Sequence, residues 1–283
     1  MEGLSNVTII IPCFNDGAYI MEAISSIVRQ TVKAEKVIIV DDGSGLETLS
    51  ILKNINIDNV EIIFQENKGV SNARNRGISL AKTKYILSLD ADDYFEATFI
   101  EKAVQVLNDN PKIGVVGCYY RVFKNNKKAK EIIKTKGGTL KDFLVKNYGL
   151  GNSMFRKQCW SDVSGYDEKM VNGYEDWEFW ISILGRNWGM YILDEVLFNY
   201  RKKESSRDSN AVKNFDFELR RYILFKHQQL YIDNFDFYAV QLLRENCNIR
   251  SGYNRLGNSI DTKIGKFILF PLRILKKIVT FKF

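Results

Sequence analysis

Histidine and paired cysteine are the scarcest features of this sequence. The chain of 283 residues has one histidine, His227, and four cysteines that lie far apart without a Cys-x-x-Cys pair. This supply excludes a zinc site built from cysteine and histidine and favours reduced cysteines. The sequence also lacks the run of about 18 apolar residues that a membrane span requires, and it shows no N-terminal secretion signal. We therefore expect a cytoplasmic protein, neither secreted nor integral to a membrane.

The positive charge is concentrated at the C-terminal end. The net charge is +7, and residues 241–283 alone hold nine Lys/Arg against two acidic residues, so the rest of the chain is balanced. A basic tail on a neutral body is not the electrostatic footprint of a nucleic-acid-binding domain. We expect no nucleic-acid partner.

Apolar runs alternate with helical patterns in the first part of the chain. The predicted strands are Val7–Pro12, Lys36–Val40, Val60–Phe64 and Tyr85–Leu89. Helices are predicted after each strand, over about 18–30, 47–54, 70–81 and 97–108. This alternation predicts an α/β fold with a Rossmann-like, mostly parallel central sheet flanked by helices, in which the loops after the strands gather at one edge.

The pattern is less regular after residue 110. Further strands are predicted at 113–123, 149–155, 190–193 and 196–200, with a hairpin or loop at 124–130, a helix at 176–184 and helical patterns over 212–248. No repeat or low-complexity linker separates these segments. We expect one α/β domain with a helical C-terminal extension.

Acidic residues follow the predicted strands. Asp90 and Asp92 stand two residues apart, so in extended chain their carboxylates project to one side. Mg²⁺ or Mn²⁺ bound to a diphosphate needs only one or two such carboxylates. The alternative is a solvated acidic turn that caps the next helix. Asp41–Ser44 follows another strand, and residues 67–77 bring amides and cations to a helix start, which suits phosphate oxygens or a nucleotide.

Four motifs in this order resemble family-2 glycosyltransferases of the GT-A fold. They are Ile-Ile-Ile-Pro-Cys-Phe-Asn at 9–15, Val-Asp-Asp-Gly-Ser at 40–44, Asn-Lys-Gly-Val-Ser-Asn-Ala-Arg-Asn-Arg-Gly at 67–77 and Leu-Asp-Ala-Asp-Asp at 89–93. A weaker similarity continues through 165–168, 175–178 and 200–201. The resemblance therefore covers about the first 205 residues.

The resemblance implies a domain organisation and an activity. A GT-A catalytic domain would span 1–205, with a donor half of about 1–110 and an acceptor half of about 111–205, and a helical extension would span 206–283. The implied enzyme is an inverting, non-processive, metal-dependent hexosyltransferase that uses a UDP-sugar and a glycan or lipid-linked glycan acceptor in surface polysaccharide biosynthesis. The alternative is a non-catalytic nucleotide-sugar-binding or scaffold protein of a polysaccharide assembly complex.

Two related classes fit less well. A processive synthase is disfavoured because the chain has neither membrane spans nor a Gln-x-x-Arg-Trp motif. A sugar nucleotidyltransferase needs a glycine-rich basic loop after the first strand, and residues 13–17 do not supply one.

The resemblance also implies site residues. Those predicted to bind the nucleotide sugar are Pro12, Phe14, Asn15, Asp41, Lys68, Gly69, Asn72, Arg74, Asp90, Ala91, Asp92, Arg201 and Lys203. Asp90 would meet the ribose, and Asp92, with Asp90 beside it, would bind the Mn²⁺ or Mg²⁺ that bridges the phosphates. The cation is expected because it stabilises the charge that develops on the leaving diphosphate.

The acceptor side is expected around residues 174–178. Asp176 is the predicted catalytic base and Glu175 the second choice, although helix starts favour acids regardless of chemistry. Trp177 and Tyr174 are predicted to bind the acceptor, and aromatic residues at such spacing are also typical of a core. His227 is expected to be structural.

One departure from the family concerns the cation. Many relatives carry a histidine three residues after the tyrosine of the Tyr-Arg pair, where this chain has Lys203. A protonated lysine cannot ligate a metal, so we predict that Lys203 and Arg201 contact the diphosphate directly and that metal affinity is weaker.

The last predicted feature is the basic apolar tail. Residues 262–283 combine many apolar side chains with six basic residues. Such a segment is suited to reversible attachment to the inner face of the cytoplasmic membrane. The alternative is a helix that packs on the domain or on a partner in an oligomer.

Overall fold

The computed structural model describes residues 5–124, 127–203, 207–259, 262 and 264. The chain divides into two compact units, Met1–Asp233 and Asn234–Phe283. The elements of the first unit are β1 (Val7–Cys13), α1 (Gly17–Val28), β2 (Lys36–Asp42), α2 (Leu46–Lys53), β3 (Val60–Gln65), α3 (Val70–Leu80), β4 (Tyr85–Ser88), β5 (Tyr94–Phe95), α4 (Phe99–Asp109), β6 (Ile113–Lys124), β7 (Lys127–Ile133), α5 (Leu140–Phe143), β8 (Met154–Arg156), α6 (Lys157–Asp162), α7 (Glu175–Leu184), β9 (Gly189–Arg201), α8 (Arg207–Asn210), the π-helix η1 (Ala211–Phe215), α9 (Asp216–Lys226) and α10 (Gln228–Asp233). The second unit contains α11 (Phe235–Asn258). The predicted functional division at residue 205 stays a prediction.

β1 is the centre of the parallel part of a nine-stranded sheet, whose order is β3-β2-β1-β4-β8-β6-β9-β5 with β7 beside β6. β1 pairs in parallel with β2 and β4, and β2 pairs in parallel with β3. All seven residues of β1 are buried, as expected for a strand with both faces covered. Cys13 lies opposite Asp41, so the first two strands end at the same edge. The predicted parallel arrangement of the first four strands is confirmed.

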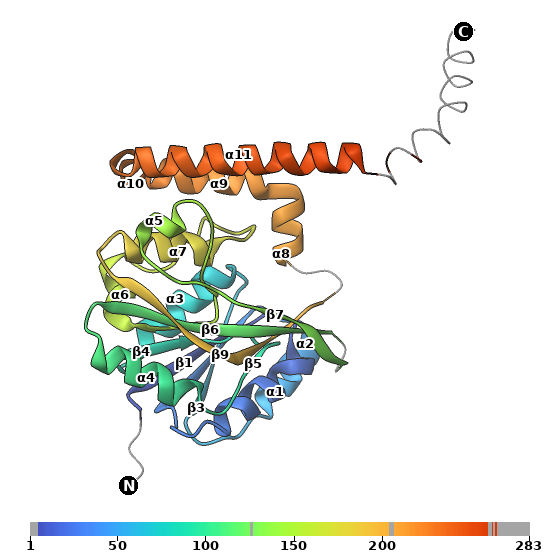
Figure 1. Ribbon diagram of the computed structural model, residues 1–283. Coiled ribbons are helices and arrows are strands. Elements are labelled where there is room, and N and C mark those ends of the chain that lie inside the picture. The colour runs from blue at the N-terminus through green and yellow to red at the C-terminus, as the bar shows by residue number, and fades with distance from the viewer. Residues whose placement is uncertain (1–4, 125–126, 204–206, 260–261, 263, 265–283) are drawn as a thin grey trace. The chain divides into compact units, whose positions relative to one another are not determined.

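Helices cover both faces of this sheet (Figure 1). α1, α2 and α4 cover one face, and α3 covers the other, where it contacts β1 and β2. α3 lies very close to the sheet, because a Cβ atom on Gly77 would come within 2.8 Å of Ile10 Cγ2. Only glycine permits this approach, which holds the later part of α3 against β1 and β2 at Ile10 and Val40.

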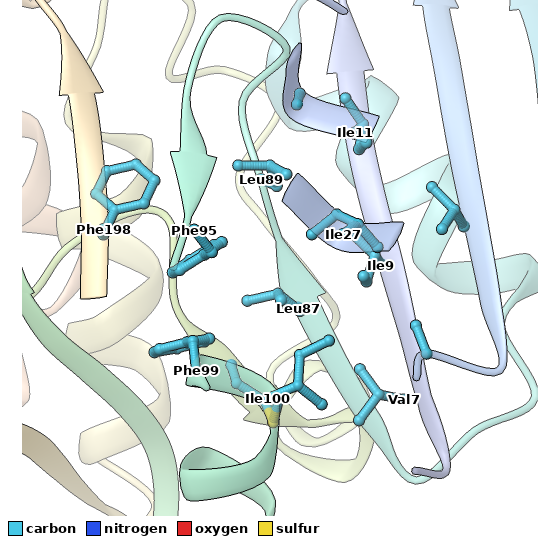
Figure 2. Close-up of a cluster of buried hydrophobic side chains, with 14 of the residues drawn as sticks. Val7, Ile9, Ile11, Ile27, Leu87, Leu89, Phe95, Phe99, Ile100 and Phe198 are labelled. Carbon is cyan, nitrogen blue, oxygen red and sulfur yellow. The ribbon is translucent and has the colours of Figure 1, made fainter. Parts of the chain in front are cut away.

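The hydrophobic core beneath α1 and α4 anchors the acidic segment between β4 and β5. Figure 2 shows Leu87 and Leu89 beside Phe95, Phe99 and Phe198. The Phe95 ring stacks on Phe99 with centroids 4.2 Å apart and lies 4.8 Å from the Phe198 ring. Each large side chain buried in this way contributes about 1.5–3 kcal/mol to the free energy of unfolding. Residues 90–93 therefore leave and re-enter a rigid core.

The second half of the sheet is mixed. β6 pairs in parallel with β9 and antiparallel with β7 and β8. The segment 124–130, predicted as a hairpin or loop, holds the end of β6 and the start of β7, which pair antiparallel, and residues 125–126 between them lie outside the described residues. The two short strands predicted at 190–193 and 196–200 are one strand, β9, whose register against β6 shifts at Cys118 and Tyr119.

One predicted strand is wrong over most of its length. The segment 149–155 is a strand only from Met154, because the preceding residues form a turn in which Ser153 Oγ donates to Leu150 O at 2.6 Å and Ser153 N–H donates to Gly151 O at 3.1 Å. This turn replaces strand pairing and places Asn152 beside Asp90.

The helices after β9 are tied to α7 by polar contacts. His227 Nε2 lies 2.8 Å from Glu178 Oε1, and Lys226 Nζ lies 2.8 Å from the same oxygen. Lys226 Nζ also lies 2.7 Å from Asp167 Oδ2. His227 thus serves the packing of α9 and α10, as expected.

Within the described residues, no helix is both long and apolar enough to cross a lipid bilayer. The tail predicted to contact a membrane, 262–283, lies outside the described residues except for 262 and 264. Its role and the cytoplasmic location stay predictions.

Candidate active site

Two adjoining clefts open at the edge where the parallel strands end. The first has a volume of about 410 Å³ and is lined by Pro12, Phe14, Asp16, Asp42, Gly69, Asp90, Ala91, Asp92, Arg201, Lys203 and Arg207, among others. The second, of about 690 Å³, is lined by residues that include Arg74, Asp90, Asn147, Asn152, Tyr174, Glu175, Asp176 and Arg207. Asp90, Tyr200 and Arg207 line both clefts, so the two spaces meet there.

Two residues predicted to bind the nucleotide sugar, Lys68 and Gly69, shape the loop before α3 through backbone groups. The N–H groups of Lys68 and Gly69 each donate to the Asp42 carboxylate at 2.8 Å, and Gly69 has a φ of 87°. That backbone conformation favours glycine and lets the loop enter α3. Lys68 is exposed and does not line either cleft, whereas Gly69 lines the first.

The turn after β1 is joined to the turn after β2. Asn15 Oδ1 accepts the N–H of Gly45 at 2.8 Å, and the N–H of Asn15 donates to Ser44 Oγ at 2.9 Å. Asn15 therefore supports the cleft wall rather than facing the cleft. Pro12 is buried in the floor, and Phe14 stands on the rim with 49% of its surface exposed. An exposed aromatic ring at that place can stack on a planar base.

Asp41 and Asn72 lie behind the cleft lining. Asp41 is buried, and its Oδ2 accepts the N–H of Ser44 at 3.3 Å, while its Oδ1 has no hydrogen-bond partner within the described part of the chain. Asn72 accepts from Gln65 Nε2 at 2.9 Å and donates to Glu168 Oε2 at 2.9 Å. Neither side chain lines the two clefts.

A buried guanidinium joins the two clefts. Arg74 Nη2 donates to Asp90 Oδ1 at 2.7 Å, and Arg74 Nη1 donates to Glu175 Oε1 at 2.9 Å. Arg207 also donates to Glu175. Burial raises the pKa of Asp90, but Arg74 outweighs it and holds that pKa below its usual range. Burial likewise raises the pKa of Glu175, and Arg207 and Arg74 bring it below the ordinary value. Both carboxylates are ionised and fixed.

Asp92 faces a lysine. Lys203 Nζ lies 2.9 Å from Asp92 Oδ2 and also contacts Asp16. Burial raises the pKa of Asp92, and Lys203 only partly offsets this. Burial lowers the pKa of Lys203, but Asp16 and Asp92 raise it above its usual value, so the amine is protonated.

Arg201 supports the same corner from below. Its Nε donates to the carbonyl oxygen of Asp92 at 2.9 Å, and its N–H donates to Asp93 Oδ1 at 2.7 Å. Its guanidinium also lies between the rings of Tyr19 and Phe123, 4.6 and 4.5 Å from their centroids. Its Nη2 also binds Glu22, so the guanidinium is shared between Asp92, Glu22 and the two rings.

Asp93 has a structural role. It is buried, accepts from Arg201 N–H and lies 3.4 Å from Asn152 Nδ2. Burial first, and then the charges of Asp92 and Asp90, raise its pKa well above the usual range. The carboxyl is therefore protonated over a wider pH range than its neighbours.

The residues predicted for the acceptor side fall into two groups, those that line the second cleft and one that is buried in the core. Asp176 lines the second cleft, where its Oδ2 accepts from Asn147 Nδ2 at 3.0 Å. Tyr174 also lines this cleft, and its hydroxyl donates to Asp216 Oδ1 at 2.6 Å. Trp177 is buried and donates from Nε1 to the carbonyl oxygen of Phe143 at 2.7 Å, so it packs in the core and lines neither cleft.

The carboxylates suit a cation that is bound mainly by its substrate. In the described residues no group of three or more His, Cys, Asp or Glu side chains could hold a metal ion by itself. Asp92, with Asp90 beside it, offers the sparse carboxylate set that Mg²⁺ or Mn²⁺ uses together with phosphate oxygens. Lys203 competes for one Asp92 oxygen.

Several residues of the site were not predicted from the sequence. Asn152 accepts the N–H of Asp90 at 2.6 Å and contacts its carboxylate at 3.2 Å. Asn147 orients Asp176, Asp16 binds Lys203, and Arg207 lines both clefts. None of these belongs to a motif with a recognisable spacing, so no sequence signal pointed to them.

The fold is an α/β fold of the GT-A type, with two clefts lined by carboxylates and cations at the strand ends. A family model described as glycosyl transferase family 2 matches residues 8–161. The chain belongs to this family.

Individual relatives are similar over part of their length. The chain is 36% identical over 117 residues to glycosyltransferase GlyG of Streptococcus pneumoniae, an alignment covering 40% of this chain and 39% of that protein. It is 27% identical over 232 residues to chondroitin synthase of Pasteurella multocida, covering 79% of this chain and 23% of that protein. It thus spans less than half the length of either relative.

A solved structure shares the fold. The crystal structure of S. aureus TarS residues 1–349 in complex with UDP-GlcNAc superposes with a TM-score of 0.66 at 20% sequence identity, covering 91% of this chain and 77% of that one. This similarity supports the GT-A architecture predicted from the motifs.

Proposed function

We propose that this chain is an inverting glycosyltransferase that moves a sugar from a UDP-sugar to a glycan or lipid-linked glycan acceptor in surface polysaccharide synthesis. The observation that carries the proposal is the meeting of the two clefts at Asp90, with Asp92 and Lys203 on one side and Asp176 on the other. Membership of the family supports the activity. Solved structures of TarS with UDP and with UDP-GlcNAc support the class of donor.

Asp176 is the proposed base. It takes the proton from the acceptor hydroxyl as that oxygen attacks the anomeric carbon, while the bond to the diphosphate oxygen breaks on the opposite face, which inverts the configuration. Glu175 is the weaker candidate, because Arg207 and Arg74 hold its carboxylate and lower its pKa, which makes it a poorer base.

Cations of the first cleft would stabilise the leaving UDP. Lys203 and Arg207 line this cleft, and their charges oppose the negative charge that develops on the diphosphate. Asp92, with Asp90 beside it, would hold Mn²⁺ or Mg²⁺, which supplies further charge neutralisation when bound. Arg74 and Asn152 keep Asp90 in position for the ribose.

Donor binding and turnover test the proposal separately. Thermal unfolding would be followed with UDP-, GDP-, CDP- and TDP-sugars, each with Mn²⁺, Mg²⁺ or EDTA, because a bound donor raises the unfolding temperature. UDP release would then be measured with and without candidate glycan acceptors, and NMR of the product would report the anomeric configuration. The expected result is stabilisation by a UDP-sugar, followed by UDP release and inversion.

The rival function is binding without catalysis, as in a scaffold of a polysaccharide assembly complex. Asp176 in an open cleft next to the donor cleft argues against it. Stabilisation by UDP-sugars without UDP release would support the scaffold instead. UDP release would have to be absent both with an acceptor and, as slow hydrolysis of the donor, without one. Retained configuration in the product would contradict the single-displacement mechanism.

A further inference from the structure

Helix α11 carries an apolar stripe that repeats every seven residues. Counting heptad positions a to g from Ala239 as a, the d positions are all apolar: Phe235, Leu242, Ile249 and Leu256. The a positions are Ala239, Asn246 and Tyr253. These residues alternate at spacings of four and three over the 24 residues of the helix. That spacing is the pattern of a coiled-coil seam.

The seam is open to solvent in the single chain. The four d-position side chains are between 44% and 72% exposed, and Tyr253 is 77% exposed. A helix of this kind gains most of its stability from packing an apolar face, because intrinsic helix propensity alone is marginal. The exposed seam therefore needs a partner.

We propose that the partner is α11 of a second copy of this chain, and that the two helices form a parallel, in-register coiled-coil dimer. Asn246 supports this choice, because a single buried asparagine at an a position favours two strands in register. In a parallel pair the two Asn246 amides face and hydrogen-bond one another, whereas an antiparallel pair sets each amide against an apolar d residue.

Charge at the edge of the seam selects the same arrangement. In a parallel pair, a g residue lies beside the e residue of the partner five positions later. Glu245 is at g and Arg250 is at e. On each side of the seam, Glu245 of one chain therefore forms an ion pair with Arg250 of the other. Tyr238 and Leu243 occupy the preceding g and e positions and extend the apolar contact.

A lipid surface is the competing occupant. The stripe has an asparagine at its centre, and an amide buried among acyl chains without a partner costs free energy. The coiled coil satisfies that amide, and the membrane does not.

Sedimentation of the full chain tests the dimer. We expect a dimer for the natural sequence and a monomer for Ile249→Asp, which places a charge in the seam. Ser251→Asp is the matched control, since the same side chain then stands at f, on the outer face, and the dimer persists. All four tryptophans lie within residues 160–188, so the unfolding transition followed by tryptophan emission reports the first unit alone and should not change in either variant.

A mixing experiment tests the register and direction. Glu245→Arg and Arg250→Glu each create like-charge pairs in their own homodimers. The dissociation constant of each homodimer should be at least several-fold higher than that of the natural dimer. Mixed in equal amounts, the two variants should form a heterodimer as tight as the natural one, seen by native mass spectrometry. Failure of the heterodimer to form would overturn the proposed arrangement.

The remaining outcomes overturn the proposal outright. A monomeric natural chain would do so, as would a dimer that survives Ile249→Asp. Cosedimentation of a monomeric chain with vesicles of anionic phospholipid, lost in Ile249→Asp but kept in Ser251→Asp, would assign the seam to a membrane instead.

Discussion

The two acidic pairs of the site, Asp90/Asp92 on the proposed donor side and Glu175/Asp176 on the proposed acceptor side, are built alike. All four side chains line a cleft, and in each pair one carboxylate binds Arg74 and the other does not. The anchored members have lowered pKa values, because arginines outweigh the cost of burial. The other two members, Asp92 and Asp176, contact Lys203 and Asn147, respectively.

The difference within each pair separates positioning from chemistry. A carboxylate held by a buried guanidinium is fixed in place and is a poor proton acceptor. One that lines a cleft without such an anchor can exchange its partner for substrate. Arg74 therefore ties Asp90 to Glu175, while Asp92 and Asp176 are the members proposed to act on the cation and on the acceptor.

The largest expected effect concerns Asp176. Asp176→Asn should lower kcat by about 100- to 10,000-fold, because the acceptor hydroxyl loses its base, with little change in donor KM. The free energy of unfolding should fall by about 1 kcal/mol, since the Asp176 carboxylate accepts from both Asn147 Nδ2 and Trp177 N–H and the amide keeps only one acceptor oxygen. The measurement is UDP release under saturating donor together with urea unfolding. If the Asp176→Asn protein kept half of the natural turnover, another residue would be the base.

The contrasting change is Arg74→Met, which removes the shared anchor. It leaves Asp90, which is partly exposed, without its main partner and the buried Glu175 with Arg207 as its remaining arginine, so the cost lies at or below the lower end of about 3–5 kcal/mol in the free energy of unfolding. Arg76→Met is the matched control, because Arg76 lies on the same helix but is exposed, and it should change stability by less than about 0.5 kcal/mol. Urea unfolding compares the two, and equal stability losses would mean that Arg74 is no anchor.

The parallel half of the sheet and the acidic residues at its strand ends could be predicted from the sequence. The β-branched runs of β1 and β2 are local signals, and parallel strands that end at one edge bring Asp41–Asp42 and Asp90–Asp93 together. The partners of Glu175 were not predictable in this way. The resemblance singles out Arg74 as a nucleotide-sugar-binding residue, but Arg74 lies 101 residues from Glu175 along the chain, and no local pattern pairs the two.

The same limit applies to the acceptor side. Trp177 and Tyr174 are both aromatic and three residues apart, yet one packs against Phe143 in the core and the other lines a cleft. The direction of each side chain depends on the left-handed backbone of Tyr174, with a φ of 59°, at the start of α7. Asn152 escaped prediction because a turn, rather than the expected strand, precedes β8.

A smaller effect is expected at Lys203. Lys203→Ala should raise the donor KM about tenfold, the scale of one charge-assisted hydrogen bond. It should also lower the Mn²⁺ concentration for half-maximal activity, because Asp92 loses its competing cation. Lys102→Ala is the control, since Lys102 binds Glu195 and lines neither cleft. Unchanged values for both quantities would contradict a contact between Lys203 and the diphosphate.

The smallest expected effect is a pH dependence of the anchor. Asp90 and Glu175 have lowered pKa values in the folded chain, so the stability they contribute is present above their ordinary values, near pH 4, and is lost as pH falls further. In Arg74→Met, Asp90 loses the charge that outweighs its burial, so its pKa rises and its protonation on acidification costs the variant less, whereas Arg207 still lowers the pKa of Glu175. The stability difference between the natural chain and Arg74→Met should therefore shrink by about 1 kcal/mol or more between pH 7 and pH 3, while the difference for Arg76→Met stays flat. Urea unfolding across this range measures both, and a constant difference for Arg74→Met would mean that Asp90 does not owe its ionisation to this guanidinium.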